Sequence, residues 1–369
     1  MAVFEPENAK TIVRFEHIEK SFDGETLVIK DLNLNIFKGE FLTLLGPSGS
    51  GKTTTLMMLA GFETPTHGEI FFNGQSISKI PPHKRNIGMV FQDYSLFPHM
   101  TIKENLAFPL KVRKFPKSEI DQKVLKALEM VKLLAFEGRR PRQLSGGQQQ
   151  RIALARALVF EPQLILMDEP LGALDKNLRE QMQYEIKHIH DELNITVVYV
   201  THDQSEALTM SNRIAVFDDG VIQQLSTPDI LYEKPQNAFV AQFIGENNRL
   251  SGKVIEIDGD KCLVEIDGGW VIKALKISIK DTGERTTVSL RPERVTVNPA
   301  PGSTDNIFEG RVEELIYLGD HVRTRATVCG NNQFIVKIPN AQGNLIVNRG
   351  QHIRLGWSSN DCRALDYLE

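Results

Sequence analysis

Residues 46–53 read Gly46-Pro47-Ser48-Gly49-Ser50-Gly51-Lys52-Thr53, which fits the pattern G-x-x-x-x-G-K-[ST]. An apolar run at residues 41–45 precedes this stretch, and helix-forming residues 54–59 follow it, so the expected order is strand, loop and helix. Glycines let successive backbone N–H groups turn inward, and the loop and first helical turn can then surround phosphate groups. Lys52 supplies a positive charge for the outer phosphates, and Thr53 supplies a hydroxyl ligand for Mg²⁺. A glycine-rich turn that binds nothing is the alternative, and the flanking elements disfavour it.

Length and composition indicate more than one domain. The chain has 369 residues and is 41% hydrophobic, which is enough for two or three cores. No apolar run approaches the roughly 18 residues of a membrane-spanning helix, and residues 1–10 lack a signal-peptide pattern. Three scattered cysteines do not form a disulfide framework or a zinc site. A net charge of -4 gives no general attraction to nucleic acid or anionic lipid, so we expect membrane contact to be made through a protein partner.

The first 240 residues combine three kinds of pattern. Strand-like segments at 12–18, 32–36 and 68–74 predict antiparallel β structure beside the phosphate loop. From Ser118, the expected N-cap, apolar residues recur at helical spacing as far as residue 131, which predicts an inserted helical subdomain over about 93–155. The apolar run 164–167, an amphipathic helix over 178–193 and the β-branched run 196–200 then form a βαβ crossover. Such a crossover requires a parallel sheet.

Helical periodicity fades after residue 245, where short alternating strands and turn sequences take over. We therefore expect two domains, 1–244 and 245–369, the second all-β and divisible into similar blocks at about 250–298 and 307–366. The expected fold class is α/β: a phosphate-loop NTPase core with an antiparallel β subdomain and an inserted helical subdomain, followed by an all-β domain.

Two adjacent carboxylates end the buried strand that precedes the amphipathic helix. Consecutive strand residues point to opposite sides, so Asp168 can hold Mg²⁺ while Glu169 polarises the attacking water, which is worth about 10² to 10⁴ in rate. His202 ends the neighbouring strand, where its imidazole can contact a γ-phosphate. A solvated acidic turn and a structural histidine are the respective alternatives. His188 and His190 are two apart on a helix and diverge, so we expect both at the surface.

A second helix start is equipped to bind an anion. Leu144-Ser145-Gly146-Gly147-Gln148 leads into a helical segment, and the phosphates of one nucleotide are already surrounded by the first loop, so this second site predicts a partner molecule. Gln92, after the strand 87–91, is a polar hinge candidate at the edge of the inserted helices. A simple helix cap at Ser145 and an ordinary loop amide at Gln92 remain alternatives.

Together these residues resemble the nucleotide-binding subunit of an ATP-binding cassette (ABC) transporter over most of residues 10–240. In that resemblance residues 46–53 are the Walker A loop, 144–148 the signature and 164–168 the Walker B strand. Asp175 ends the D-loop, and His202 is the switch histidine. Phe22 resembles the aromatic that stacks on adenine, although tyrosine is commoner there, and Gly172 stands where many members carry serine.

The resemblance implies the cofactors ATP and Mg²⁺ and a set of roles for this chain. The implied catalytic residues are Glu169, His202, Gln92 and Lys52, and the implied Mg²⁺ ligands are Thr53, Gln92 and Asp168. The residues implied to bind ATP are Phe22, Gly46, Pro47, Ser48, Gly49, Ser50, Gly51, Lys52, Thr53, Thr54, Ser145, Gly146, Gly147 and Gln148. It also implies a head-to-tail homodimer in which the serine and glycines of one signature close over ATP held by the other chain.

The C-terminal region resembles the transport-associated OB-like domain of importer ATPases. Residues 289–294, 356–357 and 361–366 are similar to those of the spermidine/putrescine group. The implied function is ATP hydrolysis that drives polyamine uptake, with phosphonate, opine, ferric iron and sugar importers as alternatives. The implied partners are two integral-membrane permease subunits and a periplasmic or lipid-anchored solute-binding protein, which would place the chain on the cytoplasmic face of the inner membrane.

Other classes fit the sequence less well. ABC ATPases that act on DNA or ribosomes are expected to have two cassettes or a long coiled coil, phosphate-loop kinases lack the signature, and GTPases carry N-K-x-D. An OB-like domain can bind single-stranded nucleic acid, but no basic surface accompanies its aromatic residues, so we expect no nucleic-acid partner. We expect these aromatics to pack in a core: Trp270, Phe308, Tyr317, Phe334 and Trp357.

Overall fold

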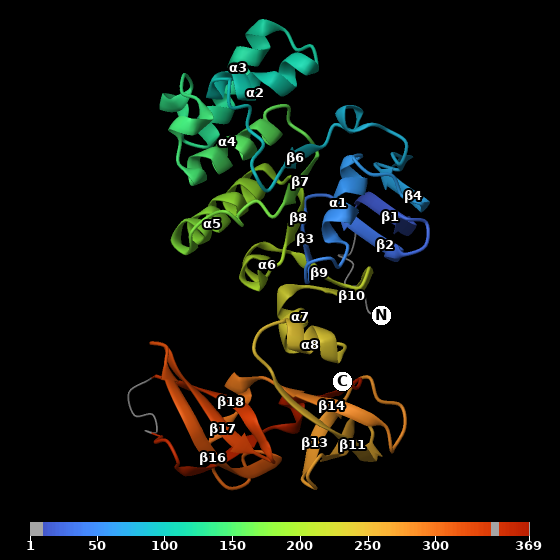
Figure 1. Cartoon of the computed structure of the whole chain (residues 1–369), viewed down its shortest axis with the longest axis vertical. Helices are drawn as coiled ribbons and strands as arrows, with labels where there is room; N and C mark the ends of the chain where they lie inside the picture. Colours follow the sequence, from blue (N-terminus) through green and yellow to red (C-terminus); the bar gives the residue numbers. More distant parts are fainter. Residues whose placement is uncertain (1–9, 341–346, 369) are drawn as a thin grey trace. The chain divides into compact units, whose positions relative to one another are not determined.

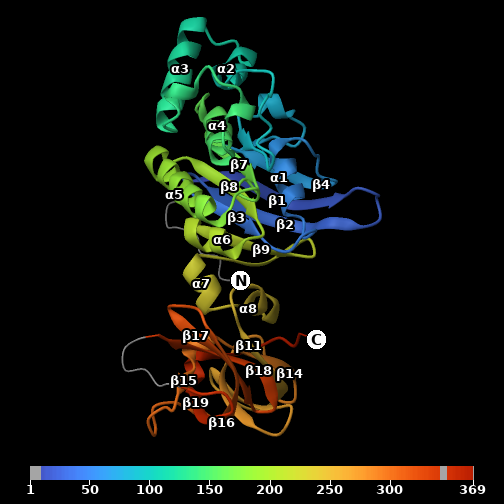
Figure 2. The ribbon, with the colours of Figure 1, turned by 60° about the vertical axis from the view of Figure 1, so that its left-hand side comes forward.

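The computed structural model describes residues 10–340 and 347–368. The chain divides into two compact units, Met1–Pro228 and Asp229–Glu369, whose elements are labelled in Figure 1 and seen from a second direction in Figure 2. The expected boundary at 244/245 lies just after helix α8 (Ala238–Phe243), so the short helices before it group with the β-rich unit.

A largely parallel sheet forms the centre of the first unit. Among the described residues its strand order is β10-β9-β3-β8-β7-β6, and the edge strand β10 is antiparallel to β9. The strands are β3 (Phe41–Leu45), β6 (Gly88–Val90), β7 (Leu164–Asp168), β8 (Thr196–Thr201), β9 (Arg213–Asp218) and β10 (Val221–Ser226). The three predicted apolar runs form β3, β7 and β8. Leu42 and Leu44 pack on one face and Phe41 on the other, which explains why these strands are apolar throughout rather than alternating.

Each face of this sheet has its own cover (Figure 1). Helix α1 (Lys52–Ala60) and an antiparallel sheet of order β2-β1-β4-β5 pack on one face. Its strands are β1 (Thr11–Ser21), β2 (Leu27–Phe37), β4 (His67–Phe72) and β5 (Gln75–Ser76). Helices α4 (Gly146–Leu158) and α5 (Lys176–Leu193) pack on the opposite face. The predicted antiparallel subdomain and βαβ crossover are both present.

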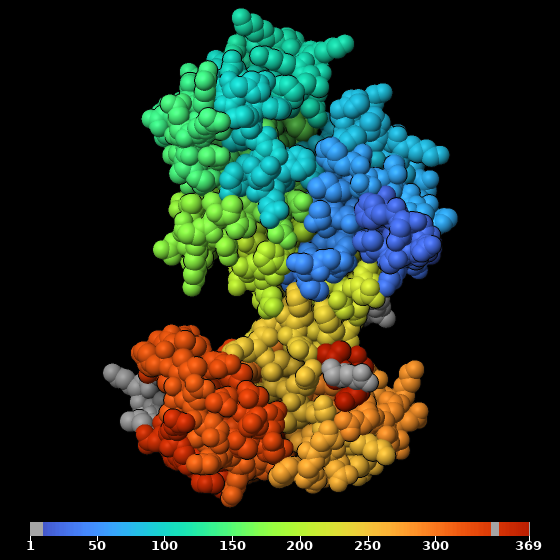
Figure 3. All heavy atoms as spheres, viewed as in Figure 1, coloured from blue at the N-terminus to red at the C-terminus, as the bar shows by residue number. Residues whose placement is uncertain are grey.

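The inserted helical subdomain has a core of its own. It contains α2 (Ile102–Val112), α3 (Lys117–Met130), the short 3₁₀ turns η2 (Leu134–Phe136) and η3 (Pro141–Gln143), and the start of α4. Figure 3 shows its residues gathered at one end of this unit, away from the blue residues of the antiparallel sheet. The N-cap of α3 is Pro116, so the expectation of Ser118 was wrong. Proline fixes a φ that suits the start of a helix, and the helix therefore begins before the serine.

The expectation that His190 lies at the surface was also wrong. Its Nε2 lies 3.1 Å from the Gly39 carbonyl oxygen, and its ring packs edge-on against Phe41 at 5.4 Å. Spacing explains the error: residues 182, 186 and 190 are four apart and share the helix face that meets the sheet. His188 is exposed, as expected. Helix α6 (Gln204–Met210) follows β8 and completes the first unit.

The second unit consists of two β assemblies and two short helices, α7 (Pro228–Glu233) and α8. Within the described residues, the first assembly is a closed barrel of order β11-β12-β13-β20-β14 and the second is a sheet of order β15-β19-β16-β17-β18. The barrel strands are β11 (Asn248–Asp258), β12 (Lys261–Ile266), β13 (Val271–Lys276), β14 (Arg285–Leu290) and β20 (Cys362–Leu365). The sheet strands are β15 (Thr296–Val297), β16 (Asn306–Tyr317), β17 (His321–Val328), β18 (Asn331–Pro339) and β19 (His352–Trp357). Turns η1 (Pro82–Lys84), η4 (Pro292–Arg294) and η5 (Ser359–Asp361) complete the described 3₁₀ segments.

The aromatic residues of this unit divide into two groups. Trp357 and Phe334 are fully buried and stack at 5.6 Å, with Phe308 packed beside Trp357. Trp270 and Tyr317 are 42% and 69% exposed, so the prediction of core packing was wrong for these two. Trp270 follows the tight turn between β12 and β13, and Tyr317 is the last residue of β16. Side chains at such positions extend beyond the core that the strand interiors form.

Candidate active site

The phosphate loop joins β3 to α1 with a backbone that only glycine accommodates. Gly51 is the N-cap of α1 with φ of 102°, and a Cβ on it would lie 2.4 Å from Ile29 Cδ1. A Cβ on Gly46 would lie 2.2 Å from the Phe217 carbonyl oxygen. No side chain caps the first turn of α1, so the donors of its N-terminus are available to a bound anion.

Lys52 is held within this loop. Its Nζ donates to the Pro47 carbonyl oxygen at 2.7 Å and approaches Ser50 Oγ at 3.4 Å. Burial lowers the pKa of the ammonium group, while the neighbouring carboxylates Glu169 and Asp168 partly oppose this effect. A partly desolvated ammonium group forms strong, charge-assisted hydrogen bonds with phosphate oxygens.

Thr53 and Asp168 meet where α1 faces the end of β7. Thr53 Oγ1 donates to Asp168 Oδ1 at 3.1 Å, and burial raises the pKa of Asp168 despite this hydrogen bond and the nearby Lys52. A hydroxyl and a carboxylate are the hard oxygen donors that Mg²⁺ accepts, alongside phosphate oxygens and water. A divalent cation here would compensate the partly desolvated carboxylate, so the donor set fits the implied ion.

Glu169 and His202 form the second pair of the site. Glu169 Oε1 lies 3.1 Å from His202 Nδ1, and the Glu169 N–H donates to the Val200 carbonyl oxygen at 3.0 Å. The φ of Glu169 is 41°, a left-handed conformation that is strained for a residue other than glycine. This backbone turns the second carboxylate away from Asp168. The two acids therefore face different surroundings, but the reason is not the strand alternation expected from the sequence, because β7 ends at Asp168 and a left-handed turn places Glu169.

Gln92 lies near the turn that follows Glu169. It comes two residues after β6, it is exposed, and a Cβ built on Gly172 would lie 4.0 Å from Gln92 Nε2. A serine at position 172, which the resemblance leads one to expect, would therefore contact this amide. Glycine leaves space there.

The signature stretch forms the N-terminus of α4. Ser145 Oγ accepts from the Gln148 N–H at 3.4 Å, and the Ser145 N–H donates to Gln148 Oε1 at 3.0 Å, which makes a capping box. Gly147 is buried, and a Cβ on it would lie 2.9 Å from Leu178 Cδ1 on α5. Ser145 and Gly146 are exposed. Nothing in the described part of this chain links these residues to Lys52 or Asp168, so the structure does not bring the two predicted anion sites together within one chain.

Phe22 occupies the loop between β1 and β2. Its ring is 61% exposed, and the Lys20 ammonium lies 4.6 Å from the ring centre. An exposed aromatic ring beside a cation offers a flat surface for a planar base. It is one of the few large apolar side chains that this part of the unit leaves in solvent.

The sequence patterns did not indicate a group of side chains behind His202. Arg179, Asp203 and Glu206 come from α5 and α6, and Arg179 interacts with both acidic residues. No short motif predicts this group, because Arg179 is separated from Asp203 by 24 residues. The signal in the sequence that could have indicated this group was Asp203, the acidic residue directly after His202.

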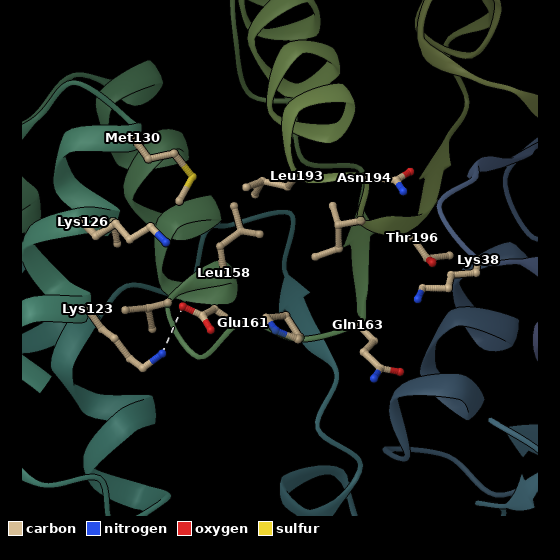
Figure 4. A pocket seen from close by; sticks show the side chains of 14 residues that line it. Lys38, Lys123, Lys126, Met130, Leu158, Glu161, Gln163, Leu193, Asn194 and Thr196 are labelled. Atoms are coloured by element: carbon tan, nitrogen blue, oxygen red, sulfur yellow. Dashed lines mark ion pairs between the residues drawn. The ribbon is translucent and has the colours of Figure 1, made fainter. Parts of the chain in front are cut away.

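A cavity lined by lysines and apolar side chains lies elsewhere in the first unit. It has a volume of about 350 Å³ and lies at the beginnings of β7 and β8, whereas the candidate site lies at their ends. Figure 4 shows lysines and apolar side chains around it, with Lys123 paired to Glu161 at 3.1 Å. Because α4 and α5 both end at this cavity, the lysines offset the partial negative charge of the helix ends.

Across the described ranges 10–340 and 347–368, no helix is long and apolar enough to cross a membrane. Two family models match the chain: one described as ABC transporter covers residues 29–172, and one described as TOBE domain covers residues 288–365. The first includes the phosphate loop and both carboxylates, and the second begins within the closed barrel.

Curated relatives resemble the chain along most of its length. A spermidine/putrescine import ATP-binding protein PotA from Trichodesmium erythraeum is 44% identical and covers 96% of this chain and 95% of its own. The protein of that name from Acetivibrio thermocellus is 50% identical, with coverage of 85% and 86%. A third, from Pseudomonas aeruginosa, is 47% identical, with coverage of 84% and 85%.

Solved structures resemble the first unit. The cbiO1 protein of Clostridium perfringens, part of the ABC transporter complex cbiONQ, is 29% identical with a TM-score of 0.56, covering 59% of this chain and 89% of its own. The ATP-binding cassette MJ0796, in a dimeric post-hydrolysis state bound to ADP and Pi, is 36% identical with a TM-score of 0.53, covering 59% and 99%. The phosphate loop, the paired carboxylates and relatives of this length and identity together lead to one conclusion: the chain belongs to the ATP-binding proteins of ABC transporters.

Proposed function

We propose that this chain hydrolyses ATP to drive the import of a polyamine, spermidine or putrescine, through separate membrane subunits. The observation that carries the proposal is the near full-length similarity to proteins named for spermidine/putrescine import, which extends through the C-terminal unit. The similarity covers 96% of the chain and is therefore not confined to the cassette, which ATPases of many importers share.

The chemistry follows from the positions of the site residues. Lys52 and the N-terminus of α1 bind the phosphates, and Thr53 and Asp168, with Gln92, would hold Mg²⁺. The bound ion would offset phosphate charge. Glu169 orients and polarises the attacking water as general base. His202, 3.1 Å from Glu169, holds this carboxylate and is placed to contact the γ-phosphate.

The signature residues 144–148 lead us to include a second copy of the chain in the proposed ATP site. In our proposal two copies associate head to tail, and Ser145, Gly146, Gly147 and Gln148 of one complete the phosphate site of the other. Phe22 stacks on the adenine. Two observations support this arrangement: Ser145 and Gly146 are exposed, and a similar cassette was solved as a dimer. Each dimer would then enclose two ATP molecules, and hydrolysis would reopen it.

The remaining partners follow from the proposed role. We place the dimer at the cytoplasmic face of the inner membrane, bound to two integral-membrane permease subunits, with a periplasmic or lipid-anchored binding protein that delivers the solute. Pumping in this arrangement requires that ATP hydrolysis respond to the loaded binding protein.

Reconstitution of the chain with its permease subunits in proteoliposomes tests the proposal. ATPase activity should rise when binding protein loaded with spermidine or putrescine is supplied, and labelled polyamine should accumulate only with ATP. Binding proteins for phosphonate, iron or sugar serve as controls, as does Glu169→Gln. Stimulation by one of those control solutes would reject the polyamine, and hydrolysis that no loaded binding protein stimulates would reject the transport role.

A further inference from the structure

Arg179 joins the two loops that flank the proposed catalytic pair. It lies one turn after Asp175, the N-cap of α5, and its Nη2 donates to the Leu174 carbonyl oxygen at 3.0 Å. Its Nη1 donates to Asp203 Oδ2 at 3.3 Å. Leu174 belongs to the turn after Glu169, and Asp203 directly follows His202. The Arg179 guanidinium therefore links the turn that follows Glu169 to the loop that contains His202 and fixes the distance between them.

Asp203 transmits this contact to the end of β8. Its Oδ1 accepts from the Ser205 N–H at 2.7 Å and the Glu206 N–H at 3.3 Å, so the carboxylate caps α6 while its other oxygen meets Arg179. The Asp203 N–H donates to Thr201 Oγ1 at 3.0 Å. His202 thus lies between two residues whose positions are fixed by hydrogen bonds.

Glu206 is a buried carboxylate that binds two residues of β8 and lies close to Arg179. It is 3% exposed, and its Oε2 accepts from Thr201 Oγ1 at 2.7 Å and from Tyr199 Oη at 2.8 Å. Arg179 Nε lies 3.9 Å from Glu206 Oε1 and, within the described residues, has no hydrogen-bond acceptor despite being buried. Buried donors of this kind are rare, and this one faces a carboxylate oxygen that a shift of about 1 Å would bring within hydrogen-bond distance.

We propose that Arg179 is a positioning residue for ATP hydrolysis, which sets His202 against Glu169 by tying the 171–174 turn to Asp203. This inference rests on the proposed ATPase function. Arg179 touches neither nucleotide nor water in this role. It acts through the two loops, and its unpaired Nε lets the turn and the histidine move together when nucleotide binds.

A purely structural role would give a different result from a positioning role. The Arg179 side chain is 31% exposed, and ion pairs of partly exposed side chains contribute little to stability. Arg179→Gln should therefore leave Tm close to that of the parent. A small displacement of a catalytic group, in contrast, costs up to about 100-fold in rate.

The test measures steady-state ATPase kinetics of the full chain. Arg179→Gln should lower kcat by about 10- to 100-fold with KM for ATP nearly unchanged. Arg179→Lys should recover part of the loss, because an ammonium group can still pair with Asp203. Lys187→Gln, which removes the Lys187–Asp191 pair on the same helix at similar exposure, is the matched control and should retain full activity.

The double variant Arg179→Gln/His202→Ala separates the outcomes. If Arg179 acts through the histidine, the double variant should be no slower than His202→Ala alone. A normal kcat for Arg179→Gln beside an inactive His202→Ala would overturn the inference and leave the proposed function intact. Full ATPase activity of His202→Ala would also overturn the inference, because hydrolysis would then not depend on the histidine, while the proposed function would stand. Fully additive losses in the double variant would reject an action of Arg179 through His202. A parent chain that does not hydrolyse ATP would instead reject the proposed function.

Discussion

The two helix starts of the nucleotide site differ in how their N-terminal donors are satisfied. Helix α1 has a glycine N-cap with no side-chain hydrogen bond, whereas α4 has Ser145 and Gln148 closed into a capping box. The first leaves backbone N–H groups available and surrounds a buried lysine. The second is complete without any ligand.

This difference shows that the two anion sites are built for different occupancy. The phosphate loop carries costs that ligand binding offsets: a helix N-terminus without a side-chain cap, a desolvated ammonium group and a partly desolvated carboxylate. The signature end of α4 carries no such cost and can remain exposed without a ligand. A stable, self-capped surface of this kind suits the interface that we propose between two copies, which would open and close in every cycle.

The largest loss of activity is expected from a substitution in the phosphate loop, where a bound ligand would offset the cost of burying charged groups. Lys52→Ala should abolish ATP binding and turnover, since it removes the ammonium group that the loop holds against Pro47 and Ser50. Calorimetric titration with ATP and a phosphate-release assay measure both. Lys38→Ala, an exposed lysine before β3, is the control. ATP hydrolysis that persists in Lys52→Ala would remove the distinction between the two helix starts.

Glu169→Gln should separate binding from hydrolysis. Turnover should fall by about 10² to 10⁴, since the amide cannot accept a proton, while ATP binding persists. The variant should accumulate as an ATP-dependent dimer on gel filtration. Glu192→Gln, an exposed acid near the end of α5, should behave like the parent. A Glu169→Gln chain that remains monomeric with ATP and hydrolyses at the normal rate would contradict both the base and the dimer.

Substitutions at Ser145 test whether the cap and the anion site are separable. Ser145→Ala should lower stability by about 1 kcal/mol, as Thr101→Ala should at the matched capping box of α2. Ser145→Asp should keep Tm, because aspartate caps equally well, yet reduce ATP-driven dimerisation through repulsion of phosphate. Thermal melts and gel filtration with Glu169→Gln as background measure these effects. Equal dimerisation of Ser145→Asp and parent would leave Ser145 as a helix cap alone.

Asp168→Asn should show the smallest effect, in thermal stability without nucleotide. Burial raises the pKa of Asp168 above its unfolded value, so the ionised carboxylate costs stability at neutral pH. The amide should therefore raise Tm by roughly 1 to 4 °C, the shift expected from about 1 kcal/mol or less. The difference should shrink as pH falls through the raised pKa and Asp168 becomes protonated. A lower Tm for Asp168→Asn at neutral pH would show that Thr53 needs the charged acceptor.

Local sequence patterns predicted the fold well where the residues of a single element are enough to indicate whether it is buried or forms a turn. The runs that became β3, β7 and β8 are apolar on both faces, and the Asn73-Gly74 turn closes the hairpin of β4 and β5. Errors arose where the environment came from distant residues. His190 is buried because the turn at Gly39 lies against the C-terminal end of α5, and Trp270 is exposed because its turn extends beyond the barrel.

The candidate site shows the same limit. The sequence suggested that strand alternation separates Asp168 from Glu169, whereas a left-handed turn after β7 does so, and the motif correctly placed Lys52 and Thr53 at the start of a helix. The link from Arg179 to Leu174 and Asp203 joins α5 to the loop after β8, and no spacing rule connects residues held together only by the packing of α5 and α6. The sequence also did not predict that β15 joins the C-terminal sheet and that β20 joins the barrel. Each of these strands is short and pairs with a strand that is distant in the sequence.

Strand β20 has a consequence for biosynthesis. It lies between β13 and β14, so the barrel that begins at Asn248 stays open until residues 362–365 have been made. The first unit can fold on the ribosome as it emerges, but the barrel of the second unit cannot close before residues 362–365 have been made. A nascent or truncated chain without β20 would expose the edges of β13 and β14 to other strands, which favours aggregation.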